Sequence, residues 1–304
     1  MVVVKRLNGK VVLVTGAGRG FGRGMAYAYA LEGAKVISVA RTISELETLK
    51  EAINKRDGDC SISATDLSKL EEMTKLRDYV EESYGRLNVL VNNAATSPWR
   101  LFEDTSVDMW DKTISVNLRA PFVLSKLFLP MMQRQESGSI INVTSASAQI
   151  GFIAEVGYCP SKFGLEGLTQ CLAMELYPYN IAVNSLNVAA PEGRRLKPTE
   201  LTLAEARNMP EDVRVLYADD ESMADAFSEA WSFLALQDAH GVTGQRLSTK
   251  QLAEFLKANG WDAAVATWRG KLTKAVYVTY DLPEKVRYQT PEGGVKDFFF
   301  KRSN

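Results

Sequence analysis

The chain has 304 residues, a formal net charge of −1 and 46 % hydrophobic residues. This composition excludes wholesale disorder, and a chain of this length buries about three quarters of its unfolded surface on folding. The near-neutral charge argues against a broad basic surface for nucleic acid. No apolar run approaches the roughly 18 residues of a membrane span, and the start at 1–6 is too short for a signal peptide, so neither is predicted.

Three cysteines and a single histidine limit the chemistry further. Cys60, Cys159 and Cys171 form no Cys-x-x-Cys pair, so neither a disulfide framework nor a metal site is predicted, and a reducing, cytoplasmic location is expected. A histidine-rich metal site is excluded, and any Ser–His–Asp mechanism would depend on His240 alone.

Short apolar runs alternate with helical patterns up to Asn187. Runs such as 11–15, which ends at glycine, are typical of strands buried on both faces. The repeated strand–helix–strand units predict an α/β fold, a doubly wound parallel sheet with helices on both faces. Strands are predicted at 11–15, 36–40, 61–64, 87–91, 139–143 and 181–186, and helices at 25–31, 46–53, 70–84, 110–132, with a bend at Pro121, and 157–176.

Beyond Asn187 the alternation weakens. Residues 188–220 are rich in Pro, Glu and Arg and are predicted to form a long loop with a short helix near 203–207. A helix at 224–235 and a last strand at 242–247 would complete a domain spanning 1–250.

A glycine-rich loop joins the first predicted strand to the first helix and reads Thr15-Gly16-Ala17-Gly18-Arg19-Gly20-Phe21-Gly22. Glycines there allow a tight turn and the close approach of a pyrophosphate to the helix N-terminus. The position between a strand and a helix favours a dinucleotide site over a purely structural turn.

Four motifs in order resemble the short-chain dehydrogenase/reductase family over about residues 8–250. The glycine loop is similar to the family's TGxxxGxG, and residues 92–95 are similar to its NNAG, with Ala95 in place of the glycine. Ser145 follows the fifth strand, and residues 158–162 form a YxxxK motif. Asn117, in the long helix, is a further match. The resemblance implies a Rossmann-type fold that binds a nicotinamide cofactor.

The resemblance also implies roles for four catalytic residues. Ser145 would orient the substrate carbonyl, with Ser147 as a less well spaced substitute, and Tyr158 would give or take the hydroxyl proton. Lys162 would lower the pKa of Tyr158 and hold the nicotinamide ribose, and Asn117 would anchor a water chain to Lys162.

Tyr158 and Lys162 are four residues apart and share one helix face. A free tyrosine has a pKa of about 10, which is too high for proton exchange at neutral pH. An ammonium about 4 Å away is worth roughly 4 kcal/mol at an effective dielectric near 20, or about three pKa units. We therefore expect Lys162 alone to bring the pKa of Tyr158 close to neutral pH, unless the two residues form an ordinary surface pair.

The second strand ends at Arg41 without the carboxylate that an NAD site usually has; Glu45 is the nearest acid downstream. Arg41 and Arg19 suit the 2′-phosphate of NADP(H), so NADP(H) is predicted in preference to NAD(H), although both could be solvated surface arginines. Asp66 is expected to contact the adenine or to cap a helix. The full set of expected cofactor contacts is Gly16, Gly18, Arg19, Gly20, Phe21, Gly22, Arg41, Thr42, Asp66, Leu67, Asn93, Ala94, Ala95, Tyr158 and Lys162.

The chain departs from the family pattern on the substrate side. The family's Pro-Gly after the sixth strand and its Asp-Gly-Gly after the last strand are missing. Arg194, Arg195 and Lys197 would attract an anion or lie in a solvated loop. Trp99, Phe102, Ile150 and Phe152 would line an apolar substrate pocket or belong to the core.

Residues 251–304 form a C-terminal extension that the resemblance does not cover. A helix is predicted at 252–258 and a hairpin from strands at 275–280 and 286–288, with a turn signal at 291–294. Because a lone hairpin is marginally stable, we expect it to dock on a neighbouring subunit, with the chain's own substrate cleft as the alternative. The resemblance implies a homotetramer or homodimer.

The predicted function is an NADP(H)-dependent carbonyl reductase or alcohol dehydrogenase that acts on a small carbonyl or secondary alcohol. A lyase or epimerase on the same fold and a non-catalytic NADP-binding regulator are the alternatives.

Overall fold

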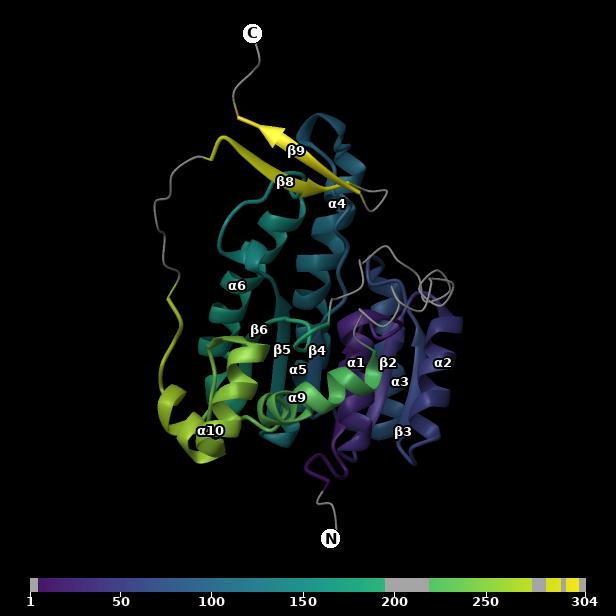
Figure 1. Cartoon of the computed structure of the whole chain (residues 1–304). Coiled ribbons are helices and arrows are strands. Elements are labelled where there is room, and N and C mark those ends of the chain that lie inside the picture. The colour runs from purple at the N-terminus through teal and green to yellow at the C-terminus, as the bar shows by residue number, and fades with distance from the viewer. Residues whose placement is uncertain (1–4, 195–218, 275–282, 291–293, 301–304) are drawn as a thin grey trace.

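The computed structural model describes residues 5–194, 219–274, 283–290 and 294–300 (Figure 1). A seven-stranded sheet runs in the order β3-β2-β1-β4-β5-β6-β7, and all its neighbours are parallel. The order reverses between β1 and β4, which is where ligands bind in doubly wound sheets. The strands are β1 (Val11–Thr15), β2 (Lys35–Ala40), β3 (Asp59–Ala64), β4 (Val89–Asn92), β5 (Gly138–Thr144), β6 (Ile181–Asn187) and β7 (Arg246–Ser248).

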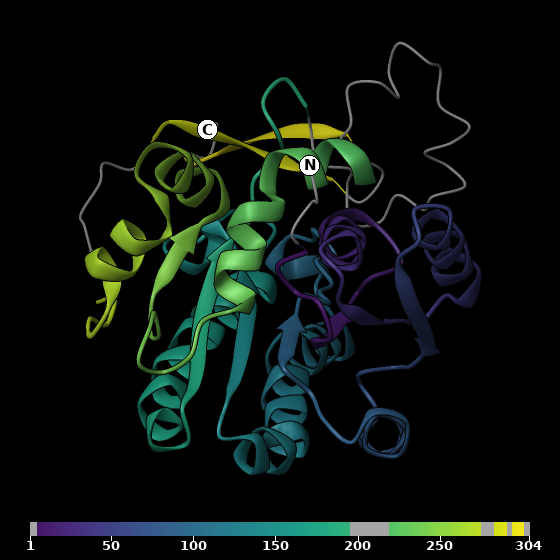
Figure 2. The ribbon, with the colours of Figure 1, turned by 90° about the horizontal axis from the view of Figure 1, so that it is seen from below.

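Two layers of helices enclose the sheet (Figure 2). Successive β1 side chains explain why this sequence needs both layers: Val12 and Val14 pack on one face, and Val11 and Leu13 on the other. One layer contains α1 (Gly20–Leu31), α2 (Ile43–Asn54), α9 (Asp220–Ala235) and α10 (Thr249–Trp268), and the other α3 (Leu70–Tyr84), α5 (Ala120–Gln135) and α6 (Tyr158–Glu175). The predicted fold is confirmed.

The long helix predicted at 110–132 consists of three pieces. α4 (Val107–Ile114) continues through a π-helical turn at Ser115–Arg119 into α5. Pro121 lies just after this π turn, so its missing N–H falls where the regular i→i−4 hydrogen bonds are already interrupted. Such π turns are frequent at functional sites, and this one carries Asn117.

The last strand is shorter than predicted, because Gly244 adopts φ +72° and the extended pairing with β6 begins only at Arg246. The helix expected at 252–258 is longer, since α10 runs on to Trp268 with a kink at Gly260 (φ +79°). The short helix expected near 203–207 lies outside the described residues. Within the described ranges, no helix is long and apolar enough to cross a membrane.

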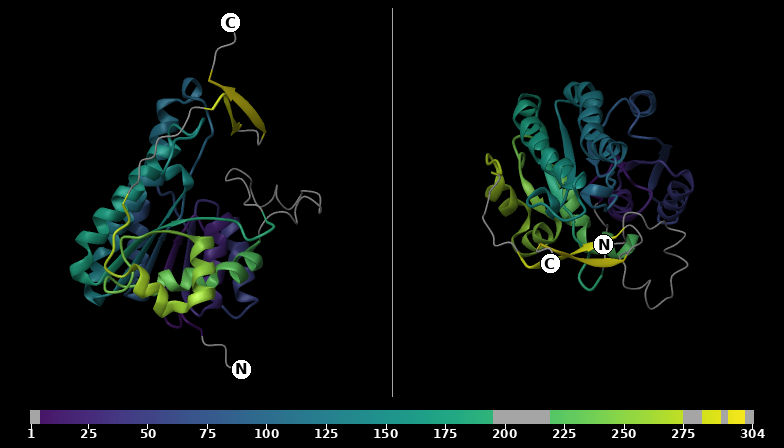
Figure 3. Two further views of the ribbon diagram at one scale, coloured as in Figure 1. Left: turned by 60° about the vertical axis from the view of Figure 1, so that its left-hand side comes forward. Right: turned by 90° about the horizontal axis from the view of Figure 1, so that it is seen from above.

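The described part of the C-terminal extension contains a hairpin in which one strand was predicted and the other was not. β8 (Lys285–Gln289) pairs antiparallel with β9 (Val295–Phe299), across the predicted turn at 291–294. The segment 275–280, which we expected to pair with β8, lies outside the described residues. Figure 3 shows the hairpin at the opposite end of the molecule from α10.

The first part of the C-terminal extension packs on the catalytic domain. Trp261 makes an edge-to-face contact with Phe233 of α9 at 5.3 Å, and its Nε1 donates to Glu229 at 3.2 Å. Further along, Thr273 Oγ1 accepts a 2.9 Å hydrogen bond from the Arg246 amide of β7. Residues 251–274 therefore cover α9 and support the last strand.

These contacts predict opposite effects for two truncations. Ending the chain after Lys274 removes only the hairpin region and should leave the melting temperature within about 3 °C of the full chain. Ending it after Gly260 also removes Trp261 and Trp268, which should cost about 3–5 kcal/mol and lower the melting temperature by about 10 °C or more. Calorimetry of both proteins beside the full chain measures this, and equal melting temperatures would contradict it.

Candidate active site

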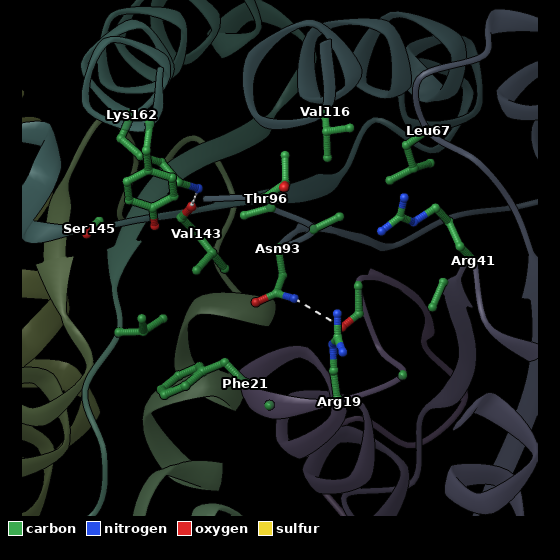
Figure 4. Close-up of a pocket in the computed structure, with 18 of the residues that line it drawn as sticks. Arg19, Phe21, Arg41, Leu67, Asn93, Thr96, Val116, Val143, Ser145 and Lys162 are labelled. Carbon is green, nitrogen blue, oxygen red and sulfur yellow. Dashed lines mark hydrogen bonds between the residues drawn. The ribbon is translucent and has the colours of Figure 1, made fainter. Parts of the chain in front are cut away.

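A cleft of about 580 Å³ opens at the carboxyl edge of the sheet, and Ser145 and Lys162 lie at the end opposite Arg41 (Figure 4). Every predicted cofactor or catalytic residue lines this cleft except Gly22 and Asn117, which lie behind its wall. Sequence reasoning missed several residues of the lining, which are Ala40, Glu45, Thr65, Thr96, Lys112, Val116, Val143, Thr144, Ala146, Asn187, Val188 and Gln289.

The glycine loop is packed against the end of β4. Asn93 Nδ2 donates to the Thr15 carbonyl at 2.9 Å, and Thr15 Oγ1 accepts from the Asn93 amide at 2.9 Å. A Cβ at Gly16 (φ +67°) would lie 2.8 Å from Ala94 Cα, and one at Gly22 would lie 2.3 Å from Asn93 Nδ2. Gly16 and Gly22 are therefore needed for the close packing of β1, α1 and β4, rather than for ligand contact alone.

The N-terminus of α1 fits a phosphate group. α1 begins at Gly20, and the preceding Arg19 makes no side-chain cap, so the amides of the first turn keep their capacity for an anion. A Cβ at Gly20 (φ +58°) would meet no atom within 4 Å, which leaves open space beside these amides.

Two arginines and two carboxylates line the far end of the cleft. Arg19 Nη1 lies 4.0 Å from Glu45 Oε1 in a partly exposed ion pair. Although burial opposes it, hydrogen bonds from Ser68 and the charge of Arg41 lower the pKa of Asp66, so this carboxylate is ionised. Glu45 was the acid that we noted downstream of β2, but its place beside Arg19 could not be read from its spacing.

Asp66 does not cap the helix that follows. α3 begins at Leu70 after Lys69, and Asp66 instead accepts hydrogen bonds from the amide and hydroxyl of Ser68. The capping alternative is therefore wrong.

Ser145 stands at the end of β5, and hydrogen bonds fix its hydroxyl. Ser145 Oγ donates to Ser147 Oγ at 3.3 Å and accepts from the Ser147 amide at 3.2 Å, and Ser147 Oγ donates to Glu155 Oε2 at 2.7 Å. Ser145 lines the cleft, whereas Ser147 does not. The geometry thus favours Ser145 over Ser147 as the residue that meets a ligand, and Glu155 is a carboxylate that sequence reasoning missed.

Tyr158 and Lys162 lie one turn apart at the start of α6. The pKa of Tyr158 differs from the expectation. Burial raises the pKa of Tyr158 to about 12, while a hydrogen bond with Ser145 opposes the increase and Glu155 adds to it. Burial also lowers the pKa of Lys162 to about 8.

The expectation that Lys162 alone brings the pKa of Tyr158 close to neutral pH is therefore wrong. Lys162 Nζ lies 5.6 Å from the centre of the tyrosine ring and donates to the Val143 carbonyl at 2.8 Å (Figure 4). Loss of solvation is the largest influence on the pKa of Tyr158, because desolvation disfavours the charged phenolate.

Asn117 is fully buried behind the cleft and connects two of its walls. Its Oδ1 accepts from the Thr96 amide at 2.8 Å, and its Nδ2 donates to the Thr96 carbonyl at 2.9 Å and to Ser161 Oγ at 3.1 Å. Since Ser161 lies between Tyr158 and Lys162, Asn117 joins the loop after β4 to the turn of α6 that carries both residues.

The four aromatic or aliphatic candidates for a substrate pocket separate in the structure. Trp99 has φ +38° and lines the cleft, as do Val188 and Gln289. Phe102 is 82 % exposed, and Ile150 and Phe152 are also exposed and do not line the cleft. Arg195 and Lys197 lie outside the described residues.

The comparisons with known proteins agree with this geometry. Residues 10–198 match the family model for short chain dehydrogenase. The chain is 40 % identical over 182 residues to an uncharacterized oxidoreductase of Thermotoga maritima, covering 59 % of this chain and 70 % of that protein. It is 30 % identical over 253 residues to galactitol 2-dehydrogenase of Agrobacterium fabrum, covering 79 % and 98 % respectively.

A solved structure shows the same fold. A metagenomic short-chain oxidoreductase in complex with NADP matches with a TM-score of 0.65 and 27 % identity, covering 80 % of this chain and 97 % of that one. The protein belongs to the short-chain dehydrogenase/reductase family, whose members are oxidoreductases that use NAD or NADP.

The buried Lys162 predicts a measurable dependence of stability on pH. Its pKa is about 8 in the folded protein and about 10.5 when unfolded, so the unfolded chain binds more protons between these values. Stability from this residue should therefore rise between about pH 8 and pH 10, by up to about 1.4 kcal/mol per pH unit. Urea unfolding of the wild type and of Lys162→Met at pH 7, 8, 9 and 10 measures the difference.

In Lys162→Met, this rise should be absent. The free energy of unfolding of the wild type should therefore increase relative to that of the variant as the pH increases. Two curves that stay parallel from pH 7 to pH 10 would show that Lys162 is not held in a desolvated state.

Proposed function

We propose that the protein transfers a hydride between NADP(H) and a carbonyl or secondary alcohol, with Tyr158 as the general acid and base. The observation that carries this proposal is the meeting of Ser145, Tyr158 and Lys162 at one end of a cleft whose other end has a free helix N-terminus and two arginines. A bound nicotinamide supplies the hydride chemistry.

The residues of the chain position the substrate and move its proton. Ser145 hydrogen-bonds the substrate oxygen and holds it next to the Tyr158 hydroxyl. In reduction, Tyr158 donates its proton to that oxygen; in oxidation, it removes the proton of the alcohol. Lys162, which already directs its ammonium into the cleft wall at Val143, holds the ribose and, with the positive charge of an oxidised nicotinamide, lowers the pKa of Tyr158.

Asn117 keeps the Tyr158–Lys162 turn in place through Ser161, and it anchors the water chain through which Lys162 exchanges protons with solvent.

Cofactor preference is a separate part of the proposal. Arg19 and Arg41 offer donors for a 2′-phosphate, and the solved relative holds NADP. Glu45 shares this end of the cleft and reduces the preference without reversing it, because Arg19 pairs with it.

Replacing Tyr158 tests the chemical role. Phe keeps the ring and removes the proton, so Tyr158→Phe should lower kcat by a factor of about 10² to 10⁴ while leaving the Kd for NADPH nearly unchanged. Steady-state assays with a panel of ketones, polyols and other secondary alcohols, together with fluorescence titration of NADPH, provide the measurement.

Retention of more than a few per cent of kcat in Tyr158→Phe would remove Tyr158 as the acid and base. Tight NADPH binding by the wild type without turnover of any panel member would favour a regulator instead.

Replacing Arg41 tests the cofactor preference. The wild type should show a higher kcat/KM with NADP(H) than with NAD(H) by about tenfold to a hundredfold, and Arg41→Asp should lose that preference. Glu45→Gln is the matched change of opposite sign, and it should increase the preference. A wild type that favours NAD(H), or an Arg41→Asp variant with an unchanged ratio, would contradict the prediction.

The C-terminal hairpin extends this proposal. Gln289 at the end of β8 lines the cleft, which favours a role in covering the substrate end, and docking on a neighbouring subunit in a homodimer or homotetramer remains a second prediction. Truncation after Lys274 should raise the KM of the best panel substrate severalfold while the Kd for NADPH stays the same. An unchanged KM, together with an unchanged number of subunits in light scattering, would exclude both roles.

A further inference from the structure

An ion pair from outside the recognised motifs lies beneath the proposed catalytic residues. Arg246 Nε lies 2.9 Å from Glu166 Oε1, and the side chains are only 16 % and 14 % exposed. Glu166 follows Lys162 by one turn of α6, and its other oxygen, Oε2, accepts from Ser185 Oγ at 2.6 Å. Ser185 and Arg246 are direct neighbours across β6 and β7, so two strands and one helix meet at this carboxylate.

The same guanidinium also reaches the proposed substrate-binding serine. Arg246 Nη2 donates to the Ser145 main-chain carbonyl at 2.8 Å. The main chain of Arg246 is itself held, because its amide donates to Thr273 Oγ1 at 2.9 Å. The planar group of Arg246 therefore contacts the end of β5 and α6 at once, through two different nitrogens.

We propose that Arg246 is a positioning residue for the reaction: by contacting both the Ser145 carbonyl and Glu166, it sets the position of Ser145 relative to the helix that carries Tyr158 and Lys162. The proposal rests on the proposed function. It assigns to the last strand of the sheet a part in the chemistry, 101 residues away from Ser145 in sequence.

An arginine is well suited to this double contact. A guanidinium presents several donors in one rigid plane and can satisfy two acceptors, whereas the ammonium of lysine acts as a single compact charge on a flexible stem. The Ser145 hydroxyl is held separately by Ser147, so Arg246 acts on the main chain and Ser147 on the side chain.

Arg246 also balances a charge close to the reacting groups. Burial lowers the pKa of Lys162, and the Glu166 carboxylate opposes that decrease. Burial raises the pKa of Tyr158, and Glu155 and Cys159 are the titratable groups that add to this increase from the other side. Without Arg246, Glu166 would remain as a poorly solvated anion, which favours the protonated form of Lys162 further.

The first test is Arg246→Gln, assayed in the direction of alcohol oxidation. We expect kcat to fall about tenfold or more with the Kd for NADPH within about twofold of the wild type. The alkaline limb of the pH profile, where Lys162 loses its proton, should move to higher pH, because the unbalanced Glu166 favours the protonated form of Lys162. A general loss of stability would lower the active fraction and leave the limb where it is.

Two further variants separate charge balance from position. Arg246→Gln combined with Glu166→Gln removes the unbalanced anion, so the pH profile should return to that of the wild type while kcat stays low. Arg246→Lys restores the charge but only one contact, so it should restore the pH profile and only part of kcat.

Arg134→Gln is the matched control, since it breaks an exposed arginine–glutamate pair, with Glu81 at 2.7 Å, and should behave as the wild type. Tyr158→Phe is assayed in parallel. If Tyr158→Phe is inactive while Arg246→Gln keeps kcat within about twofold and an unchanged pH profile, the role of Arg246 is refuted and the proposed function stands. If Tyr158→Phe is active, the proposed function is refuted, and the role of Arg246 that rests on it is refuted as well.

Discussion

Lys162 is only 2 % exposed and lies near the start of α6, at the carboxyl edge of the sheet. A buried charge needs partners, and Nζ finds one in the Val143 carbonyl of β5 at 2.8 Å. That contact fixes α6 relative to β5, and Ser145 follows β5 directly. The closeness of Ser145 and Tyr158 therefore depends on how this one lysine is accommodated.

Hydrogen bonds across neighbouring elements support the same edge. Thr15 and Asn93 join β1 to β4, Asn117 joins the loop after β4 to α6, and Arg246 joins β7 to the end of β5. Each bond spans a large distance in sequence and connects a strand end to a neighbour. The cleft is consequently formed by main chain that is held on several sides, which is what pre-organised donors require.

Much of this arrangement could be predicted, because the decisive residues follow strand ends. The glycine loop, Asn93, Ser145 and the Tyr158–Lys162 pair each come from a local pattern, and parallel strands bring their carboxyl ends to one edge. The alternation of strands and helices likewise predicted the doubly wound parallel sheet and both helix layers.

The remainder depends on contacts that no local pattern contains. Glu166 and Arg246 are 80 residues apart, and Gln289 reaches the cleft from the far end of the chain. The pKa of Tyr158 could not be predicted from the spacing of Tyr158 and Lys162, because burial has the largest influence on it and depends on tertiary packing. The pairing of β8 with β9 was not predicted, because residues 295–299 were not assigned as a strand from their sequence.

The central claim is that Tyr158, with a pKa of about 12 in the protein alone, becomes an effective acid and base when an oxidised nicotinamide cofactor adds its charge to that of Lys162. The most direct measurement is the ultraviolet difference titration of phenolate, wild type minus Tyr158→Phe, with and without saturating NADP⁺. The account predicts that the pKa of Tyr158 falls by about two units or more when NADP⁺ is bound. An identical titration with and without NADP⁺ would contradict it.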